Sequence, residues 1–283
     1  FLNRCTDGVY PPGSTFKILT TLAGLQQGVV DSQTYFQECN GSIMISNRIF
    51  RCWETHYELN LLEAFKQSCD VYFYQLGMKI GLDQLAKYAY LSGFGDNIGI
   101  DIFEESNGLV PDSKYLNKKY GRNGWGIGQT ANLSIGQGDL LVTPLQMAAF
   151  ILALLNDGEK IKPFIVDSIL DKHGELRYRQ KKKIDGQLVF SALAMDFIKK
   201  CMFEAVNGEK GTGAGAKNSY CSISGKTGSA ENSSGITHAW FVSYFPSENP
   251  EVICVIVIEN SGHGGEIAAP FASKIAEKWM NLK

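Results

Sequence analysis

YCSISGKTGSA (220–230), THAWFVSYFP (237–246) and EVICVIVIEN (251–260) are three strand candidates that follow one another near the C-terminal end of the chain. Turn signals separate them, at Asn232 to Gly235 and at Ser247 to Pro250. Consecutive strands with short turns between them favour antiparallel pairing. The sequence therefore predicts an antiparallel sheet in the last third of the chain.

Apolar residues at helical spacing surround these strands along the sequence. Thr143 and Pro144 have the residue types of an N-cap and a first helical position. Residues 31–60 are expected to form an irregular loop and residues 96–126 a turn-rich polar segment, while a His173-Gly174 turn predicts a hairpin within residues 162–190. The expected helices cover residues 14–26, 61–68, 70–81, 82–95, 144–158, 191–208 and much of 262–282.

The composition is that of a globular chain with a sizeable core, because 44% of the 283 residues are apolar and 20% are charged. Its 27 basic and 29 acidic residues leave a net charge of -2, so no overall field attracts nucleic acid, and no nucleic-acid partner is expected. The longest apolar runs, 148–155 and 252–258, are shorter than the roughly 20 residues of a membrane span. Seven cysteines, an odd number, do not indicate a disulfide scaffold.

Ser14 and Lys17 lie three residues apart at the start of the first expected helix, so their side chains share one face. A serine hydroxyl becomes a good nucleophile when a neighbouring base takes its proton, and a partly desolvated lysine can be that base. This spacing is common in helices that have an N-capping serine and an exposed lysine. The pair therefore indicates a catalytic site only together with other motifs.

Two further motifs follow in order along the chain. Ser68-Cys69-Asp70 lies between two expected helices, and Lys226-Thr227-Gly228-Ser229 begins the first strand. A glycine at that place lets a ligand lie against the strand edge. The ordered set of Ser-x-x-Lys, Ser-x-Asp and Lys-Thr-Gly-Ser is far more specific than any one member, and it resembles the serine penicillin-recognising enzymes.

Longer stretches make this resemblance more specific. YPPGSTFK (10–17), LSIGQGDLLVTPLQMA (133–148), SGKTGSA (224–230) and GGEIAAP (264–270) are similar to the transpeptidase domain of class B penicillin-binding proteins. Cys69 within Ser-x-Asp is similar to the elongation-type branch, penicillin-binding protein 2. The resemblance implies an α/β fold of the penicillin-binding and serine β-lactamase type, in which helices flank an antiparallel sheet beside an all-helical subdomain. It covers residues 1–283 as one domain, with the helical subdomain at about 28–160 and the sheet mainly in 161–283.

The resemblance also implies roles for the motif residues. Ser14 would be the acylated nucleophile, Lys17 its base and Ser68 a proton relay to the leaving amine. Asp70 would orient Lys17 or the substrate amide, and Lys226 would keep the site electropositive. Thr227, Gly228 and Ser229 would complete the substrate-binding strand, and the backbone N–H groups of Ser14 and Ser229 would form an oxyanion hole.

The function implied is a peptidoglycan D,D-transpeptidase that cross-links stem peptides, is inhibited by β-lactams and needs no catalytic cofactor. Glu58-Leu59-Asn60 precedes Ser68, the wrong order for the water-activating glutamate of class A β-lactamases, so slow deacylation is expected. The alternatives are a related hydrolase, either a β-lactamase or a D,D-carboxypeptidase, and a penicillin sensor domain without turnover.

Cys39, Cys52, His56 and Cys69 form a second group of interest, because three thiolates and an imidazole fill a tetrahedral zinc site. By resemblance to the elongation-type branch, His56 and Cys69 are expected ligands of a structural zinc. Cys39 and Cys52 are added on ligand chemistry alone. The alternatives are a Cys39–Cys52 disulfide and separate buried thiols.

The resemblance finally implies partners and a location. It implies a bacterial periplasmic enzyme on the outer face of the cytoplasmic membrane, with a glycosyltransferase and the elongation machinery as partners. The chain begins at Phe1 without an initiating Met, so an upstream anchor, a pedestal and the first sheet strands are expected to precede it.

Overall fold

A computed structural model describes residues 2–102, 104–231 and 235–282. Strands β7 (Ser224–Ala230), β8 (His238–Phe245) and β9 (Val252–Ile258) form an antiparallel sheet in the order β7-β8-β9. Every residue of β7 is paired with β8, Gly228 lying opposite Trp240. This confirms the antiparallel sheet expected from residues 220–260, while the expected turn at Asn232 to Gly235 lies largely outside the described residues.

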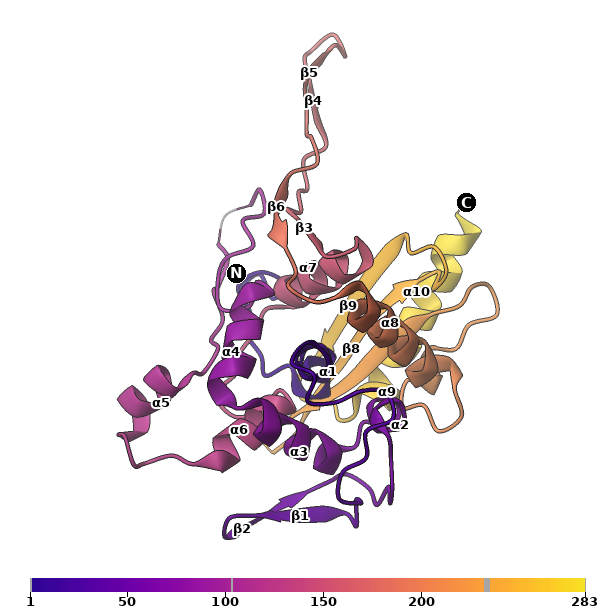
Figure 1. Ribbon diagram of the computed structural model, residues 1–283. Helices are drawn as coiled ribbons and strands as arrows, with labels where there is room; N and C mark the ends of the chain where they lie inside the picture. The colour runs from indigo at the N-terminus through magenta and orange to yellow at the C-terminus, as the bar shows by residue number, and fades with distance from the viewer. Residues whose placement is uncertain (1, 103, 232–234, 283) are drawn as a thin grey trace.

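The two faces of β8 belong to different cores, as the alternation of side chains along a strand requires. Trp240, Val242 and Tyr244 join the larger cluster, which also contains residues of α1 (Lys17–Gln26), α3 (Asp70–Ile80) and α8 (Ala192–Asn207). Phe241 and Phe245 face the opposite way, into a smaller cluster with alanines of α10 (Ala269–Asn281). The sheet thus lies between helices on both faces (Figure 1).

Four of the described helices begin at a residue whose side chain caps them: Asn60, Asp112, Thr143 and Ser191. Asn60 caps α2 by accepting from the backbone N–H of Glu63, and Thr143 with Gln146 forms a capping box at α7. The other helices that contribute to the larger cluster are η1 (Gly13–Phe16), α2 (Leu61–Lys66), α4 (Leu82–Leu91), α6 (Ile127–Ser134) and α7 (Pro144–Leu155). Shorter or outlying helices are α5 (Ser113–Tyr120), η2 (Ala214–Ala216) and α9 (Gly264–Ile267).

Two expected loops contain regular structure, so these expectations were wrong. Residues 31–60 include an antiparallel hairpin of β1 (Ser42–Ile45) and β2 (Arg48–Arg51). Residues 96–126 include α5. The hairpin has few buried side chains, so it lacks the alternation that marks a half-buried strand.

A second hairpin extends away from the rest of the chain (Figure 1). β4 (Ser168–Leu170) and β5 (Leu176–Arg179) form it, and β3 (Glu159–Ile161) pairs with β6 (Ile184–Gln187) at its base. The hairpin expected at His173-Gly174 is therefore confirmed, and the lysines at 181–183 are exposed. The described helices include none with the length and apolarity of a membrane span.

A close approach between η1 and β7 positions the first and third motifs beside each other. Gly13 has φ +55°, and a side chain there would come within 2.7 Å of the Ser229 carbonyl oxygen. A side chain at Gly228 would lie 2.9 Å from the Pro12 carbonyl oxygen. Only glycine at both positions allows this contact, because it has no Cβ and tolerates positive φ.

Candidate active site

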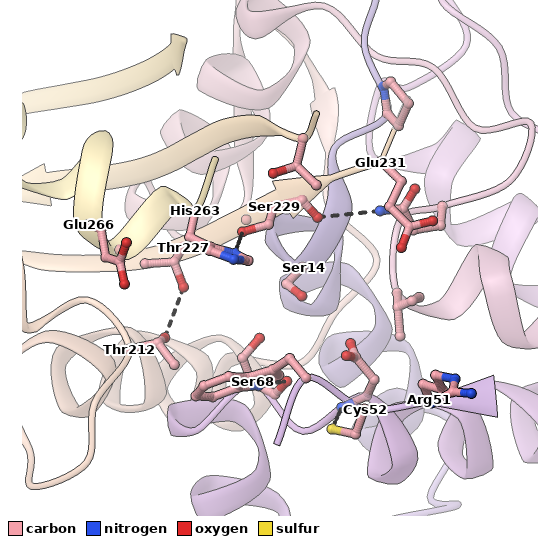
Figure 2. A pocket seen from close by; sticks show the side chains of 18 of the residues that line it. Ser14, Arg51, Cys52, Ser68, Thr212, Thr227, Ser229, Glu231, His263 and Glu266 are labelled. Carbon is pink, nitrogen blue, oxygen red and sulfur yellow. Dashed lines mark hydrogen bonds between the residues drawn. The ribbon is translucent and has the colours of Figure 1, made fainter. Parts of the chain in front are cut away.

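The three motifs line one cleft of about 1170 Å³. Ser14 lies in its centre, with Ser68 below it and Thr227 and Ser229 of β7 on the side of the sheet (Figure 2). Residues separated by more than 200 positions in the sequence are thus brought to one place. The structure brings Ser14, Lys17, Ser68, Asp70 and Lys226 to Ser229 together, as the sequence predicts.

Lys17 is fully buried at the start of α1, where its ammonium group is held by three oxygen atoms. The distances from Nζ are 2.6 Å to Oδ1 of Asp70, 2.9 Å to the Ser68 carbonyl oxygen and 3.3 Å to Oγ of Ser68. Such charge-assisted bonds fix both position and orientation. Asp70 was expected to orient either Lys17 or the substrate amide. The structure shows its contact with Lys17.

Ser68 connects the two lysines of the site. Its Oγ lies 2.9 Å from Nζ of Lys226 and 3.3 Å from Nζ of Lys17. Ser68 occupies the turn between α2 and α3 with φ +55°, a conformation that non-glycine residues rarely adopt. This strained turn points the hydroxyl into the cleft, which is consistent with the clustering of backbone strain at functional sites.

Lys226 is the second buried lysine, and burying its positive charge is energetically unfavourable. Burial lowers the pKa of Lys226 well below its usual value of 10.5, and the nearby Lys17 ammonium lowers this pKa further. Asp70 opposes the shift, while burial raises the pKa of Asp70 against the influence of Lys17. Burial and Lys17 thus both favour the neutral form of Lys226, beside the Ser68 hydroxyl.

Replacing Lys226 with methionine is expected to raise the midpoint of thermal unfolding at about pH 7 by a few degrees, since about 1 kcal/mol corresponds to about 2–4 °C. A lowered pKa means that the folded state binds fewer protons than the unfolded state, so wild-type stability rises with pH between the lowered value and 10.5. The variant lacks this component, and the difference from wild type should shrink by about pH 10. Lys199→Met, at the Lys199–Asp196 pair on α8, is the control and should show no such pH-dependent gain.

Hydroxyl groups line the sheet side of the cleft. Thr227 Oγ1 donates to Thr212 Oγ1 at 2.9 Å, and Ser229 Oγ lies 3.2 Å from Nδ1 of His263. The backbone N–H of Gly264 also donates to Ser229 Oγ, at 3.3 Å. The sheet side of the cleft therefore presents polar groups to a ligand.

Several cleft residues were not identified from the sequence. Gln137 and Glu266 lie in stretches that carry the resemblance, 133–148 and 264–270, and His263 lies in a glycine loop, but no role was expected for them. Gln137 reaches the Ser229 carbonyl oxygen with Nε2, at 3.3 Å. The others include Arg51, Trp53, Tyr74, Asn132, Thr212, Glu231 and Glu266.

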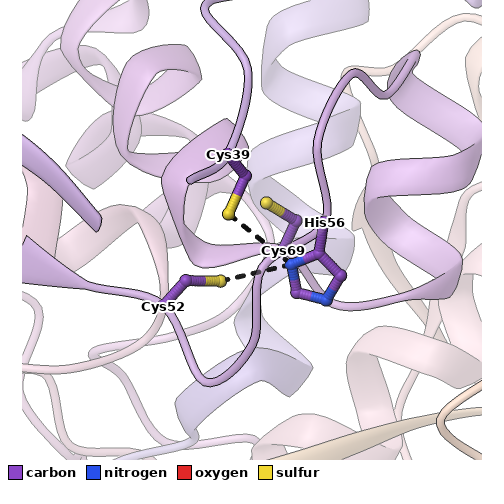
Figure 3. Close-up of side chains that lie close together, drawn as sticks. All are labelled: Cys39, Cys52, His56 and Cys69. Atoms are coloured by element: carbon purple, nitrogen blue, oxygen red, sulfur yellow. Dashed lines mark hydrogen bonds between the residues drawn. The ribbon is translucent and has the colours of Figure 1, made fainter. Parts of the chain in front are cut away.

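Cys39, Cys52, His56 and Cys69 converge on a common point below the cleft (Figure 3). Their ligand atoms all lie within 4.8 Å of one another, and all seven cysteines of the chain are free thiols. Nδ1 of His56 is 3.7 Å from the Cys39 sulfur and 3.5 Å from the Cys52 sulfur. The four residues thus lie together, not separately, and no disulfide joins them.

The geometry and chemistry of this cluster fit a zinc ion. Zinc bonds of about 2.3 Å to sulfur and about 2.0 Å to nitrogen at tetrahedral angles place S and N about 3.5 Å apart. A hydrogen bond from Cys69 lowers the pKa of the Cys52 thiol to about 2, despite burial. That bond and burial raise the pKa of Cys69, and burial raises the pKa of Cys39. The cluster therefore already favours one thiolate, the form that binds metal.

The cluster is connected directly to the second motif. Cys69 is the middle residue of Ser68-Cys69-Asp70, and the backbone N–H of Asp70 donates to the Cys52 sulfur at 3.2 Å. Trp53 Nε1 reaches the Ser68 carbonyl oxygen at 3.2 Å. The loop that carries Cys52 thus holds the backbone of the strained turn in place.

The chain matches a family model and is similar to curated proteins along nearly its whole length. A family model described as the penicillin binding protein transpeptidase domain matches residues 1–277. A peptidoglycan D,D-transpeptidase MrdA of Acinetobacter baumannii is 31% identical over 98% of this chain and 43% of its own length. That of Haemophilus influenzae is 31% identical over 99% of this chain and 46% of its own length. The chain thus spans less than half the length of these two curated relatives.

Among the solved structures that this chain resembles are two of PBP2. PBP2 of Pseudomonas aeruginosa in complex with WCK 5153 has a TM-score of 0.85 at 31% identity, covering 98% of this chain and 60% of that one. The complex of PBP2 and MreC from Helicobacter pylori has a TM-score of 0.85 at 27% identity, covering 99% of this chain and 51% of that one.

Proposed function

Because the chain belongs to the penicillin-binding protein transpeptidase family, we propose that it catalyses D,D-transpeptidation of peptidoglycan stem peptides through an acyl-enzyme on Ser14. The observation that carries this proposal is the cleft itself. Ser14 and Ser68 both line it, the Ser68 hydroxyl is shared by two buried lysines, and the edge of β7 with Thr227 and Ser229 faces them. The elongation-type branch is the subtype that the PBP2 and MrdA relatives favour.

In the proposed reaction Ser14 Oγ attacks the carbonyl carbon between the two terminal D-alanines, and Lys17, after giving its own proton to Asp70, takes the serine proton. Backbone N–H groups of Ser14 and Ser229 stabilise the developing oxyanion, a contribution of about 3 kcal/mol for each good donor. Ser68 gives its hydroxyl proton to the departing amine and takes the proton held by Lys17, while Lys226, Thr227 and Ser229 hold the carboxylate of the departing D-alanine. An amine of a neighbouring strand then attacks the ester, forms the cross-link and returns the proton to Ser14.

This function is tested by the mass of the intact protein after incubation with benzylpenicillin. A persistent adduct of one penicillin per chain is expected, absent in Ser14→Ala and present in the control Ser222→Ala, whose hydroxyl contacts Glu248 outside the cleft. Rapid return to the free mass would indicate a β-lactamase instead. Absence of an adduct in the wild-type protein would contradict the proposal.

Turnover then separates the transferase from the remaining alternatives. With a D-Ala-D-Ala pentapeptide and an added amine, the expected product is the new amide together with free D-alanine. Hydrolysis alone, even at high amine concentration, would indicate a D,D-carboxypeptidase. An adduct without any turnover of peptide would indicate a sensor domain.

The proposed setting of the enzyme is the outer face of the bacterial cytoplasmic membrane, where its stem-peptide substrates occur. The relatives support a place in cell elongation beside a glycosyltransferase. One solved relative is a complex of PBP2 with MreC, and another belongs to a peptidoglycan synthase complex that coordinates polymerisation and crosslinking.

We further propose that Cys39, Cys52, His56 and Cys69 hold a structural zinc ion. The ion would join the loop of residues 39–56 to the turn that carries Ser68 and Asp70, and it would take no part in the reaction steps. Denatured protein is expected to release about one zinc per chain, measured with a chromogenic chelator. Protein purified in the presence of zinc that releases none would refute the site.

A further inference from the structure

We infer that a groove next to the cleft binds the acidic acyl part of the donor stem peptide, the residues that precede its terminal D-alanines. This inference rests on the proposed function and extends it to the substrate residues that lie away from the scissile bond. The groove has a volume of about 560 Å³. It is lined by Arg48 and Phe50 of β2, by the segment from Asn123 to Gln129 and by Asn132 of α6.

The groove adjoins the cleft at two elements. Asn132 of α6 lines both spaces. Strand β2 also contributes to both, with Arg48 and Phe50 on the groove and Arg51, on the other face of the strand, on the cleft. Asn132 is therefore the point at which a chain that leaves the cleft reaches the groove.

The direction of the donor peptide follows from the chemistry of acyl transfer. The departing D-alanine places its carboxylate near Thr227 and Thr212, so the acyl chain must extend from Ser14 the other way. Figure 2 shows Thr212, Thr227 and Glu266 on one side of Ser14, and Arg51 with Glu231 on the other. The acyl chain thus points toward Arg51 and, beyond it, the groove.

Arg48 is the one charged side chain among the described residues that line the groove, and its charge favours an acidic chain. It is exposed and takes part in no ion pair among the described residues, and the same holds for Arg51 of the cleft. A guanidinium group binds carboxylates through paired N–H donors. The amide of Asn132, at the junction, has the donors and acceptor that the main chain of an extended peptide requires.

The walls of the groove are already held in place without a ligand. Phe50 packs edge-on against Tyr74, with ring centroids 5.4 Å apart, and Trp125 Nε1 donates to Oδ1 of Asn117 at 2.8 Å. A side chain at Gly128 would come within 2.9 Å of the Phe50 ring, so glycine there keeps the helix start close to β2. A preformed site of this kind loses little conformational entropy on binding.

The test compares a long acidic donor with a short one that does not reach the groove. The long donor is a pentapeptide with a free carboxylate on its second residue and a D-Ala-D-Ala terminus, and the short one is benzylpenicillin. For Arg48→Ala, the ratio of kcat/KM for the pentapeptide to the acylation rate constant for penicillin is expected to fall about five- to tenfold, mostly through KM. Arg48→Lys should recover part of the loss, and Arg179→Ala on the distant hairpin should show none.

A second donor peptide tests whether the effect depends on the carboxylate of the substrate. When the carboxylate of the pentapeptide is converted to an amide, wild type and Arg48→Ala should use it equally well. An unchanged ratio in Arg48→Ala, or an equal loss with the amidated donor, would overturn the inference while leaving the transpeptidase proposal intact. A wild-type protein that penicillin does not label would instead refute the proposed function.

Discussion

Replacing Lys17 with alanine is expected to slow acylation by penicillin about 10²- to 10⁴-fold, the usual contribution of a positioned general base. Lys17 is fully buried, and its Nζ touches Asp70 and both oxygens of Ser68. No other described lysine in the site contacts Asp70, because Lys226 contacts Ser68 and the Thr227 carbonyl oxygen. The rate is measured by quenching the reaction and following the mass of the adduct.

The same variant is expected to be less stable by about 3 kcal/mol, because it leaves the Asp70 carboxylate buried without its partner. Burial raises the pKa of Asp70, so the loss should grow as pH rises above about 4, the value of an unfolded aspartate. The double variant Lys17→Ala, Asp70→Asn removes the unpaired charge and should recover much of the stability, but not the rate. If the rate recovers with stability, Lys17 acts as a structural residue.

Replacing Cys69 with serine is expected to lower zinc content to near zero and the midpoint of thermal unfolding by about 10 °C or more, because zinc binding contributes directly to folding free energy. Cys69 is fully buried, and it joins the cluster of three cysteines and His56 to the turn that carries Ser68. The acylation rate should fall as well, since that turn positions two oxygen atoms around Lys17. Metal analysis, thermal unfolding and adduct formation on one preparation give the three readouts.

Cys201→Ser provides the matched control. Cys201 is fully buried in α8, and burial raises the pKa of its thiol, but it lies outside the cluster. It should lose some stability through the buried hydroxyl while keeping zinc and acylation. A Cys69→Ser variant that keeps one zinc per chain and a rate close to wild type would contradict the proposed ligand set.

Much of the fold was predictable because local signals agree with the tertiary packing. The sheet strands alternate or run apolar, and short turns separate them. Capping residues such as Asn60 and Thr143 mark helix starts that the structure bears out. Where local preference and packing point the same way, the sequence alone is sufficient.

The elements that were missed have weak local signals. β1 and β2 are short and mostly exposed, so burial imposes no periodicity on them. α6 contains glycine, serine, threonine and asparagine, which favour helices poorly. Packing on α3 maintains it, where Gly77 has so little space that a side chain would meet Ser134 at 2.2 Å. Such tertiary support is invisible in a single sequence.

The candidate site also contains residues that the sequence indicates and residues that it does not. Its motif residues carry fixed spacings, and the structure brings them together, whereas their catalytic roles stay predictions. Arg51 lies on β2, Asn132 on α6 and His263 on a loop, and these segments meet only in the folded chain. The lowered pKa of Lys226 also depends on burial and on Lys17, neither of which its own neighbours in sequence reveal. Sequence thus indicates the reacting groups better than the walls around them.

The positive φ of Ser68 has a consequence for protein engineering. Glycine adopts φ +55° without steric cost, so a serine at this turn is less favourable than glycine by about 1 kcal/mol. A library screened only for heat resistance should therefore enrich glycine at position 68 and, by the same reasoning, apolar residues at position 226. Both changes remove a polar group from the candidate site. Heat-resistant clones of this protein would need a parallel screen for penicillin labelling, because the most stable of them would be the least reactive.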